Sequence, residues 1–387
     1  MIFKETNTTV TLPSRRGKGE VFTKLGRIPG AQMIYVSALA CTRHRNIDFI
    51  TLQRQGRLSF LMFDGIDMVT GDYIDKTKQA AAEIAAERSP TGLVLLAGCQ
   101  SALLATDYKL LAKEIEEETG VPVRVHDGCR LCNFDEEEGG PSAVDKILYD
   151  FIAPVQKSSE PSVNILTSGT VDERCELPSL LSQAGVSAVR TLDSCRTWAD
   201  YQTMGSAWVN IITTPKDTEL AIYLEEKLGI PWVCLGGIYS VDDLTVSYQK
   251  LGSILNHTFD LSEQTAKLTD LLADTKSAAE DKTITVEDDG ELAKWLLTEG
   301  YPVTAVKLNP HQGITNEQRR WLDDHGVKIE NPMRGGKGRP GGPVGPGGKP
   351  GRPGGKPGRH PENLKLGYAG ALEALHTLKR SAGGDER

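Results

Sequence analysis

The sequence lacks several features that assign a chain to a familiar class. Its 387 residues contain no apolar run of the roughly 18 residues that a membrane helix needs. Residues 1–20 lack the apolar centre of a signal peptide, so we expect a cytoplasmic protein without membrane association. Lys and Arg number 44 against 52 Asp and Glu, and this acidic balance disfavours a nucleic-acid-binding protein.

Nucleotide-binding and hydrolase motifs are also missing. No G-x-x-x-x-G-K-S/T phosphate loop occurs, and no G-x-G-x-x-G follows the first aliphatic run. ATP hydrolysis and nicotinamide binding within this chain are therefore not supported. The segment GCQSALL (98–104) departs from the G-x-S-x-G turn of the α/β-hydrolases, so no hydrolase nucleophile is indicated.

Short aliphatic runs alternate with longer amphipathic segments. The aliphatic runs are continuous rather than alternating, which is typical of parallel strands buried on both faces. We therefore predict an α/β protein with two or three Rossmann-like, doubly wound parallel-sheet subdomains. The predicted strands are 33–38, 58–63, 93–97, 122–126, 163–167, 186–191, 207–212, 231–235, 303–308 and 327–330. The predicted helices are 75–88, 103–120, 218–229 and 291–300.

A Gly/Pro-rich segment interrupts this pattern at residues 334–359. It carries seven basic residues and no acidic ones, so it cannot bury apolar surface and we expect it to be disordered. It is either a solvated loop, or a cationic lid or a cationic segment that docks a partner's acidic face. The predicted parts are an N-terminal α/β domain with the candidate ligand cysteines discussed below (1–155), a second Rossmann-like domain (156–258), a third α/β segment (259–333), this insertion, and a C-terminal helix packing back on the core (360–387).

Seven cysteines, an odd number, do not form a typical disulfide framework. In a reducing compartment they are buried residues, reactive thiols or metal ligands. Cys41, Cys99 and Cys129 each come shortly after a predicted strand. Because the carboxyl ends of parallel strands share one sheet edge, where ligands collect, the three together predict a shared site. Any one of them alone is more often a core residue.

A C-x-x-C pair, Cys129 and Cys132, lies in the segment DGCRLCNFD (127–135). It suits ligation of a metal or cluster, a redox disulfide, or a purely structural role. No second C-x-x-C occurs, so a zinc site with four thiolates needs distant partners. Cys41 and Cys99 offer another arrangement, since two thiolates from each chain of a two-fold dimer supply the four that a [4Fe–4S] cluster uses.

Three stretches of the sequence resemble the nitrogenase component 1 family: MIYVSALACTRHRNIDF (33–49), LMFDGIDMVTGDYIDKTKQAAAEI (61–84) and LVLLAGCQSALLATDYKLLAKEIEEETGVPVRVHDG (93–128). Residues 206–235 and 360–372 resemble its second domain and closing segment. In that family, cysteines at the positions of Cys41 and Cys99 ligate an iron–sulfur cluster at a subunit interface. The resemblance implies a [4Fe–4S] cluster, a homodimer or paralogous heterodimer, and a separate ATP-dependent reductase similar to the nitrogenase iron protein.

The sequence departs from the family pattern at other ligand positions. No cysteine precedes Cys41, where the family carries a third cluster ligand. The cysteine and histidine that hold the molybdenum cofactor align with Thr213 and Leu366, which cannot replace them. The resemblance therefore implies an organic substrate, such as a tetrapyrrole, rather than dinitrogen.

The segment HDGCRLCNF (126–134) aligns with the family's cofactor and substrate cavity. Cys129 and Cys132 are thus further candidate metal ligands. Arg130 is a candidate partner for a substrate carboxylate or phosphate, or else a surface salt-bridge residue. His126 and His44 are candidate proton donors, although single histidines are more often structural.

Two readings other than a catalytic subunit remain open at this point. The chain is either a non-catalytic scaffold on which a metal cluster or cofactor is assembled, or an α/β binding protein whose cysteines are core residues. The first would carry iron without turnover, and the second would carry no iron.

Overall fold

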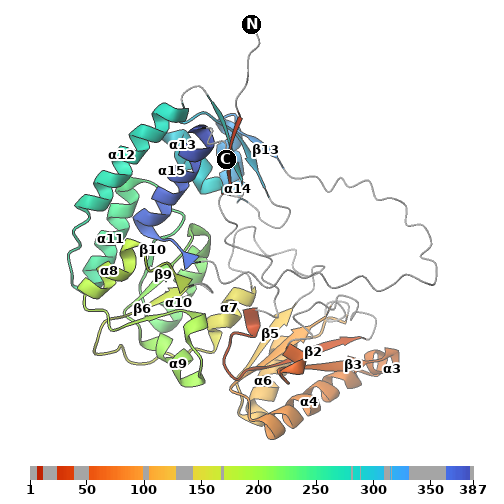
Figure 1. The fold of residues 1–387 in the computed structure, drawn as a ribbon. Coiled ribbons are helices and arrows are strands. Elements are labelled where there is room, and N and C mark those ends of the chain that lie inside the picture. The colour runs from red at the N-terminus through yellow and green to blue at the C-terminus, as the bar shows by residue number, and fades with distance from the viewer. Residues whose placement is uncertain are drawn as a thin grey trace, which may run out of the picture. The chain divides into compact units, whose positions relative to one another are not determined.

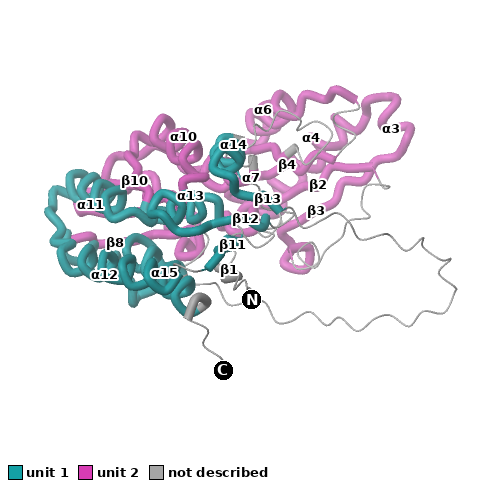
Figure 2. Tube along the Cα trace, turned by 90° about the horizontal axis from the view of Figure 1, so that it is seen from above, with its two compact units in different colours: residues 1–18, 169–184, 235–387 teal, residues 19–168, 185–234 magenta. Residues whose placement is uncertain are grey.

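The computed structural model describes residues 7–11, 24–38, 52–98, 104–127, 143–166, 170–279, 282–287, 289–308, 314, 316–330 and 363–383. The chain divides into two compact units, coloured separately in Figure 2. Unit 2 holds residues 19–168 and 185–234, and unit 1 holds residues 1–18, 169–184 and 235–387. In the described part of the chain, no helix is long and apolar enough to cross a membrane. The basic insertion 334–359 lies outside the described residues, and the five predicted domain ranges stay a prediction.

The first sheet of unit 2 has the strand order β3-β2-β4-β5, and all its pairs are parallel. Its strands are β2 (Gln32–Ala38), β3 (Leu58–Phe63), β4 (Leu93–Ala97) and β5 (Val123–Asp127). Every residue of β4 is buried, as expected for a central strand covered on both faces. The helices that connect the strands are α3 (Gly65–Thr70), α4 (Asp72–Arg88) and α6 (Tyr108–Thr119), and α7 (Ala143–Asp150) follows β5 (Figure 1).

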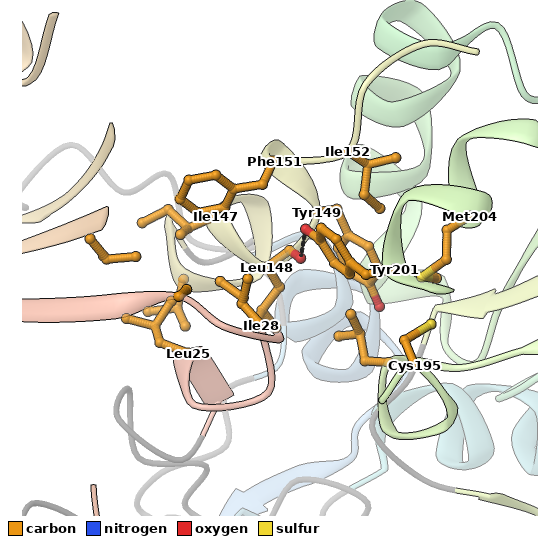
Figure 3. Packing of buried hydrophobic residues seen from close by; sticks show 14 of the residues in the cluster. Leu25, Ile28, Ile147, Leu148, Tyr149, Phe151, Ile152, Cys195, Tyr201 and Met204 are labelled. Atoms are coloured by element: carbon orange, nitrogen blue, oxygen red, sulfur yellow. Dashed lines mark hydrogen bonds between the residues drawn. The ribbon is translucent and has the colours of Figure 1, made fainter. Parts of the chain in front are cut away.

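The second sheet of unit 2 has the parallel order β10-β9-β6-β8. Its strands are β6 (Ser162–Leu166), β8 (Ala188–Arg190), β9 (Val209–Ile212) and β10 (Trp232–Cys234), with helices α9 (Trp198–Gln202) and α10 (Thr218–Leu228). One hydrophobic cluster joins residues from both halves of the unit (Figure 3). At its centre the hydroxyl of Tyr201 donates to the carbonyl of Leu148 at 2.6 Å. The cluster joins the two sheets within one compact unit.

A partly buried ionic group supports the same junction. Asp150, the last residue of α7, accepts from Lys227 Nζ and from the Tyr223 hydroxyl, each at 2.6 Å. Its other carboxylate oxygen lies 2.6 Å from Arg124 Nε on β5. Burial raises the pKa of Asp150, but the hydrogen bonds from Lys227 and Tyr223 outweigh it and lower the pKa below its ordinary value. Burial, followed by the bond to Asp150, raises the pKa of Tyr223 to about 12.

Unit 1 contains a third parallel sheet, β1-β11-β12-β13. Its strands are β1 (Asn7–Thr11), β11 (Thr283–Glu287), β12 (Val303–Lys307) and β13 (Lys328–Glu330). The two-residue strands β7 (Thr170–Val171) and β14 (Asn363–Leu364) pair separately. The helices are α8 (Glu176–Gln183), α11 (Val241–Leu255), α12 (Ser262–Ala279), α13 (Gly290–Thr298), α14 (Asn316–Asp324) and α15 (Gly367–Gly383).

The C-terminal helix α15 is fastened at its first turn. Glu176 accepts backbone N–H groups from Tyr368 at 2.5 Å and Ala369 at 3.1 Å, and the hydroxyl of Tyr248 at 2.8 Å. Gly367 has a positive φ of 61°, and a Cβ there would meet Tyr248 and Glu176. A carboxylate therefore satisfies helix-terminal donors that would otherwise be unpaired.

The predicted fold class is confirmed. Parallel sheets covered by helices form Rossmann-like subdomains, and every strand predicted from the sequence overlaps an observed strand. The predicted helices correspond to α4, α6, α10 and α13. The sequence patterns did not predict β1, β7, β11 and β14.

Candidate functional site

The carboxyl edge of the first sheet in unit 2 is the candidate site. Along the chain β2 leads to β3 on one side, whereas β4 lies on the other side of β2 and leads on to β5. The direction in which strands are added thus reverses between β2 and β4. Open α/β sheets bind ligands at the carboxyl ends of the strands beside such a reversal.

The strands that lead to the predicted cluster ligands are the two that flank this reversal. Cys41 comes three residues after β2 ends at Ala38, and Cys99 comes two residues after β4 ends at Ala97. The strands pair directly, with Val36 opposite Ala97, and the N–H of Gly98 donates to Val36 O at 3.1 Å. The chain therefore enters both cysteine segments from neighbouring strands.

Most of the predicted site residues themselves lie outside the described residues, namely Cys41, His44, Cys99, Cys129, Arg130 and Cys132. β5 ends at Asp127 beside β4, so the C-x-x-C segment also starts from this edge. The donor set fits an iron–sulfur cluster, because thiolates are its usual ligands and the sequence supplies them after three adjacent strands. Within the described ranges, no group of three or more His, Cys, Asp or Glu side chains is arranged to hold a metal.

The structure places His126 on β5, opposite Leu96 of β4, where it is half-buried. His126 therefore lies on the strand that pairs directly with β4, close to the carboxyl edge of the sheet. Its role as a proton donor stays a prediction. Thr213, which follows β9, is buried, and Leu366 is fully buried. Neither side chain offers a thiolate or an imidazole to a cofactor.

The three remaining cysteines lie among core residues. Cys175 and Cys195 are buried, and Cys234 is half-buried at the end of β10. The thiol of Cys175 donates to Asp172 O at 2.8 Å. Burial raises the pKa of both Cys175 and Cys195, which keeps them protonated and unreactive. They are suitable reference cysteines for experiments on the candidate ligands.

Helix α3, which follows β3 at the same edge, was not predicted from the sequence. Asp64 caps it by accepting from the backbone of Ile66 at 2.8 Å and of Asp67 at 3.0 Å. Asp67 in turn accepts from Lys76 at 2.5 Å, and this hydrogen bond lowers the pKa of Asp67 and raises that of Lys76. The only sequence signal is a capping pattern in DGID, since six residues are too few for a visible helical period.

The turn after the Cys99 segment has a strained backbone. Ala105 has a φ of 49°, a left-handed conformation that costs an alanine free energy and that glycine adopts easily. Asp107 then caps α6 by accepting from the N–H of Leu110 at 2.9 Å. Strain of this kind persists where the surroundings fix the chain, and it is found most often near functional sites.

We expect Ala105→Gly to raise the free energy of unfolding by up to about 1 kcal/mol, because glycine removes the left-handed penalty. Urea unfolding of the purified chain measures the change. Ala86→Gly, on an exposed position inside α4, is the matched control and is expected to lower stability by about 0.5–1 kcal/mol. Equal destabilisation by both substitutions would contradict the strain at Ala105.

Comparison with known proteins gives one family match. The model of the nitrogenase component 1 type oxidoreductases matches residues 24–299, which is most of the chain. No curated protein matches the chain significantly. Among solved structures, "Nitrogenase Cp1 at pH 5" is similar with a TM-score of 0.47 and 16% identity over 81% of this chain and 74% of that one. "Nitrogenase Cp1 at pH 6.5" gives a TM-score of 0.46 and 15% identity over 84% and 78%. The extent of the family match shows that this chain belongs to the nitrogenase component 1 type oxidoreductases.

Proposed function

We propose that this chain is a subunit of a nitrogenase-like oxidoreductase that passes electrons from an ATP-dependent iron–sulfur reductase to an organic substrate such as a tetrapyrrole. Proteins of the family bind iron–sulfur clusters and work with an iron-protein partner. Cys41 and Cys99 hold half of an interfacial [4Fe–4S] cluster, and an identical or paralogous subunit holds the other half. The observation that carries the proposal is the pairing of β2 with β4 beside the reversal in strand order.

When bound, such a cluster supplies one-electron transfer at a potential that depends on burial and hydrogen bonding. The chain provides the thiolates of Cys41 and Cys99, with Cys129 and Cys132 as additional ligands. Val36, two residues before the end of β2, and Ala97, the last residue of β4, are almost completely buried. These side chains belong to the hydrophobic cluster that the sheet forms with α4 and α6.

Two residues of this chain favour an organic substrate over dinitrogen. They align with the positions at which nitrogenase holds its molybdenum cofactor. Thr213 and Leu366 are buried and cannot ligate it. In this proposal Arg130 binds an acidic group of the substrate, and His126 or His44 supplies protons during the reduction. The reductase is the electron source, and each electron that reaches the substrate is matched by a proton from solvent through these groups.

The outer face of α3 is the proposed docking surface for the reductase. Ile66 is 70% exposed and Val69 is 89% exposed on this helix. Leu104 and Leu110, beside the start of α6, are also exposed. Four exposed carboxylates lie nearby: Asp64 and Asp107 cap α3 and α6, and Asp72 and Asp75 lie in the first turn of α4. One exposed lysine, Lys76, lies among them.

This combination of charge and apolar surface favours a basic partner over a second copy of the same face. Two copies that met through α3 would bring their carboxylates together, and like charges that face each other cost free energy. A reductase with an apolar contact surrounded by Lys and Arg would instead meet complementary charge. α3 follows the edge strand β3, so a partner seated on it approaches the sheet edge from which the cluster segments start.

We expect Val69→Lys to weaken binding of a nitrogenase-type iron protein by at least about tenfold, because it places a like charge against the basic partner and removes apolar contact area. Binding is measured by analytical ultracentrifugation with a non-hydrolysed ATP analogue. Val246→Lys, on an exposed position of α11 in unit 1, is the matched control. Loss of affinity in both variants, or in neither, would contradict the assignment of α3.

Anaerobic purification followed by iron and sulfide analysis tests the proposal as a whole. We expect four iron and four sulfide per dimer, with the broad visible absorbance of an iron–sulfur protein. Turnover of a tetrapyrrole with a reductase and ATP then separates a catalyst from an assembly scaffold, which would carry iron without turnover. Protein that contains no iron under these conditions would refute the proposal.

A further inference from the structure

Tyr73, the second residue of α4, connects the start of this helix to the turn that precedes α6. Its side chain is buried, and its ring lies 5.2 Å from that of Phe63 at the end of β3. Its hydroxyl forms a short hydrogen bond with the hydroxyl of Thr106. The start of α4 is thereby joined to the turn that precedes α6.

Thr106 directly follows the strained residue Ala105, and both come after the Cys99 segment. The N–H of Tyr108 donates to Thr106 O at 3.1 Å, so a tight turn holds the position of the Thr106 backbone. A left-handed alanine needs surroundings that fix it, and the bond from Tyr73 is such a constraint. Two separate observations, the strain at Ala105 and the partly buried hydroxyl pair, thus point to a fixed path for the turn before α6.

The described residues on either side of segment 99–103, which carries Cys99, are held by hydrogen bonds. Before it, Gly98 bonds to Val36 on the neighbouring strand β2. After it, Thr106 bonds to Tyr73. A metal ligand must be held close to its working geometry, and constraints on both flanks of a ligand segment serve that purpose.

We propose that Tyr73 is a positioning residue for Cys99, acting through Thr106. The part that concerns the cluster rests on the proposed function, whereas the anchoring of the loop does not. In this proposal the Tyr73 hydroxyl positions Cys99 through its hydrogen bond to Thr106, and the aromatic ring only packs. Tyr73→Phe keeps the packing against Phe63 and removes only the bond to Thr106.

Hydrogen–deuterium exchange of the full chain tests the anchoring. We expect the peptide 98–108 to exchange about tenfold faster in Tyr73→Phe than in the parent protein, because one partly buried hydrogen bond is lost. Thr106→Val removes the same bond from the other side and is expected to give the same increase, without further gain in the double variant. Tyr201→Phe, which loses the bond to Leu148 in the same unit, is the matched control and should leave this peptide unchanged. Parental exchange in Tyr73→Phe would overturn the anchoring.

The role toward the cluster is read from the anaerobic holoprotein. We expect Tyr73→Phe and Thr106→Val to shift the midpoint potential and the electron paramagnetic resonance spectrum in the same direction, while Tyr201→Phe changes neither. Unchanged spectra and potential in both variants of the pair would overturn that role. Absence of iron from the parent protein would refute the proposed function and the role toward the cluster, and the exchange rates would still decide the anchoring.

Discussion

Cys99→Ala and Cys41→Ala are each expected to abolish the visible absorbance of the anaerobic protein and to lower its iron content to the background of the preparation. A [4Fe–4S] cluster uses four thiolates, and in a two-fold dimer one substitution removes two of them. β2 and β4 pair directly, so the two segments start side by side and neither cysteine has an equivalent replacement on its own strand. The loss is measured as iron and acid-labile sulfide per dimer.

Cys195→Ala is the matched control, because this cysteine is buried in the core of the same unit. It is expected to keep the full iron content and to cost about 1 kcal/mol of stability. Iron retained in Cys41→Ala or Cys99→Ala, or lost equally in the control, would contradict the ligand assignment. The pair Cys129→Ala and Cys132→Ala separates additional ligands, which would lower the iron content, from structural thiols, which would not.

The sequence was informative where local pattern decides structure. Continuous apolar runs such as LVLLA (93–97) predicted buried parallel strands because such a run suits a strand covered on both faces, and β4 has these bounds. β1 and β11 were missed, since NTTVT and TITVE carry little apolar content and become strands by pairing with each other across the chain, Asn7 with Thr283. Their Thr, Val and Ile residues favour strands, but both segments lack the continuous apolar run by which the other strands were predicted.

The candidate site was predictable only in part for the same reason. Positions after strands identified Cys41 and Cys99, but the order of strands in the sheet is set by packing, so only the structure shows that β2 and β4 are neighbours. The bond between Tyr73 and Thr106 and the exposed face of α3 also depend on how helices settle on the sheet. Contacts between side chains far apart in the sequence follow no fixed spacing, so a sequence pattern cannot predict them.

Asp150→Asn is expected to lower the free energy of unfolding by about 2–4 kcal/mol, the largest stability effect that we expect in unit 2. Asparagine keeps the size of the side chain but removes the charge that compensates Lys227 and Arg124. Both cations are mostly buried, with side chains 22% and 27% exposed, so neither can be fully solvated by water. Glu117→Gln, at an exposed pair with Lys113 on α6, is the control and should change stability by less than about 0.5 kcal/mol.

The pH dependence of this loss distinguishes the charge from the packing. The pKa of Asp150 in the folded chain is below its ordinary 3.8, so its contribution is fully present above that value and is lost as the pH falls toward the folded pKa. Urea unfolding is therefore expected to separate the parent and Asp150→Asn by the full amount at pH 7, and the gap should narrow as the pH falls below about 4. Protonation removes the charge of Asp150 and weakens its interactions with Lys227 and Arg124. A difference in unfolding free energy that stays constant down to pH 3 would therefore assign the loss of stability to packing.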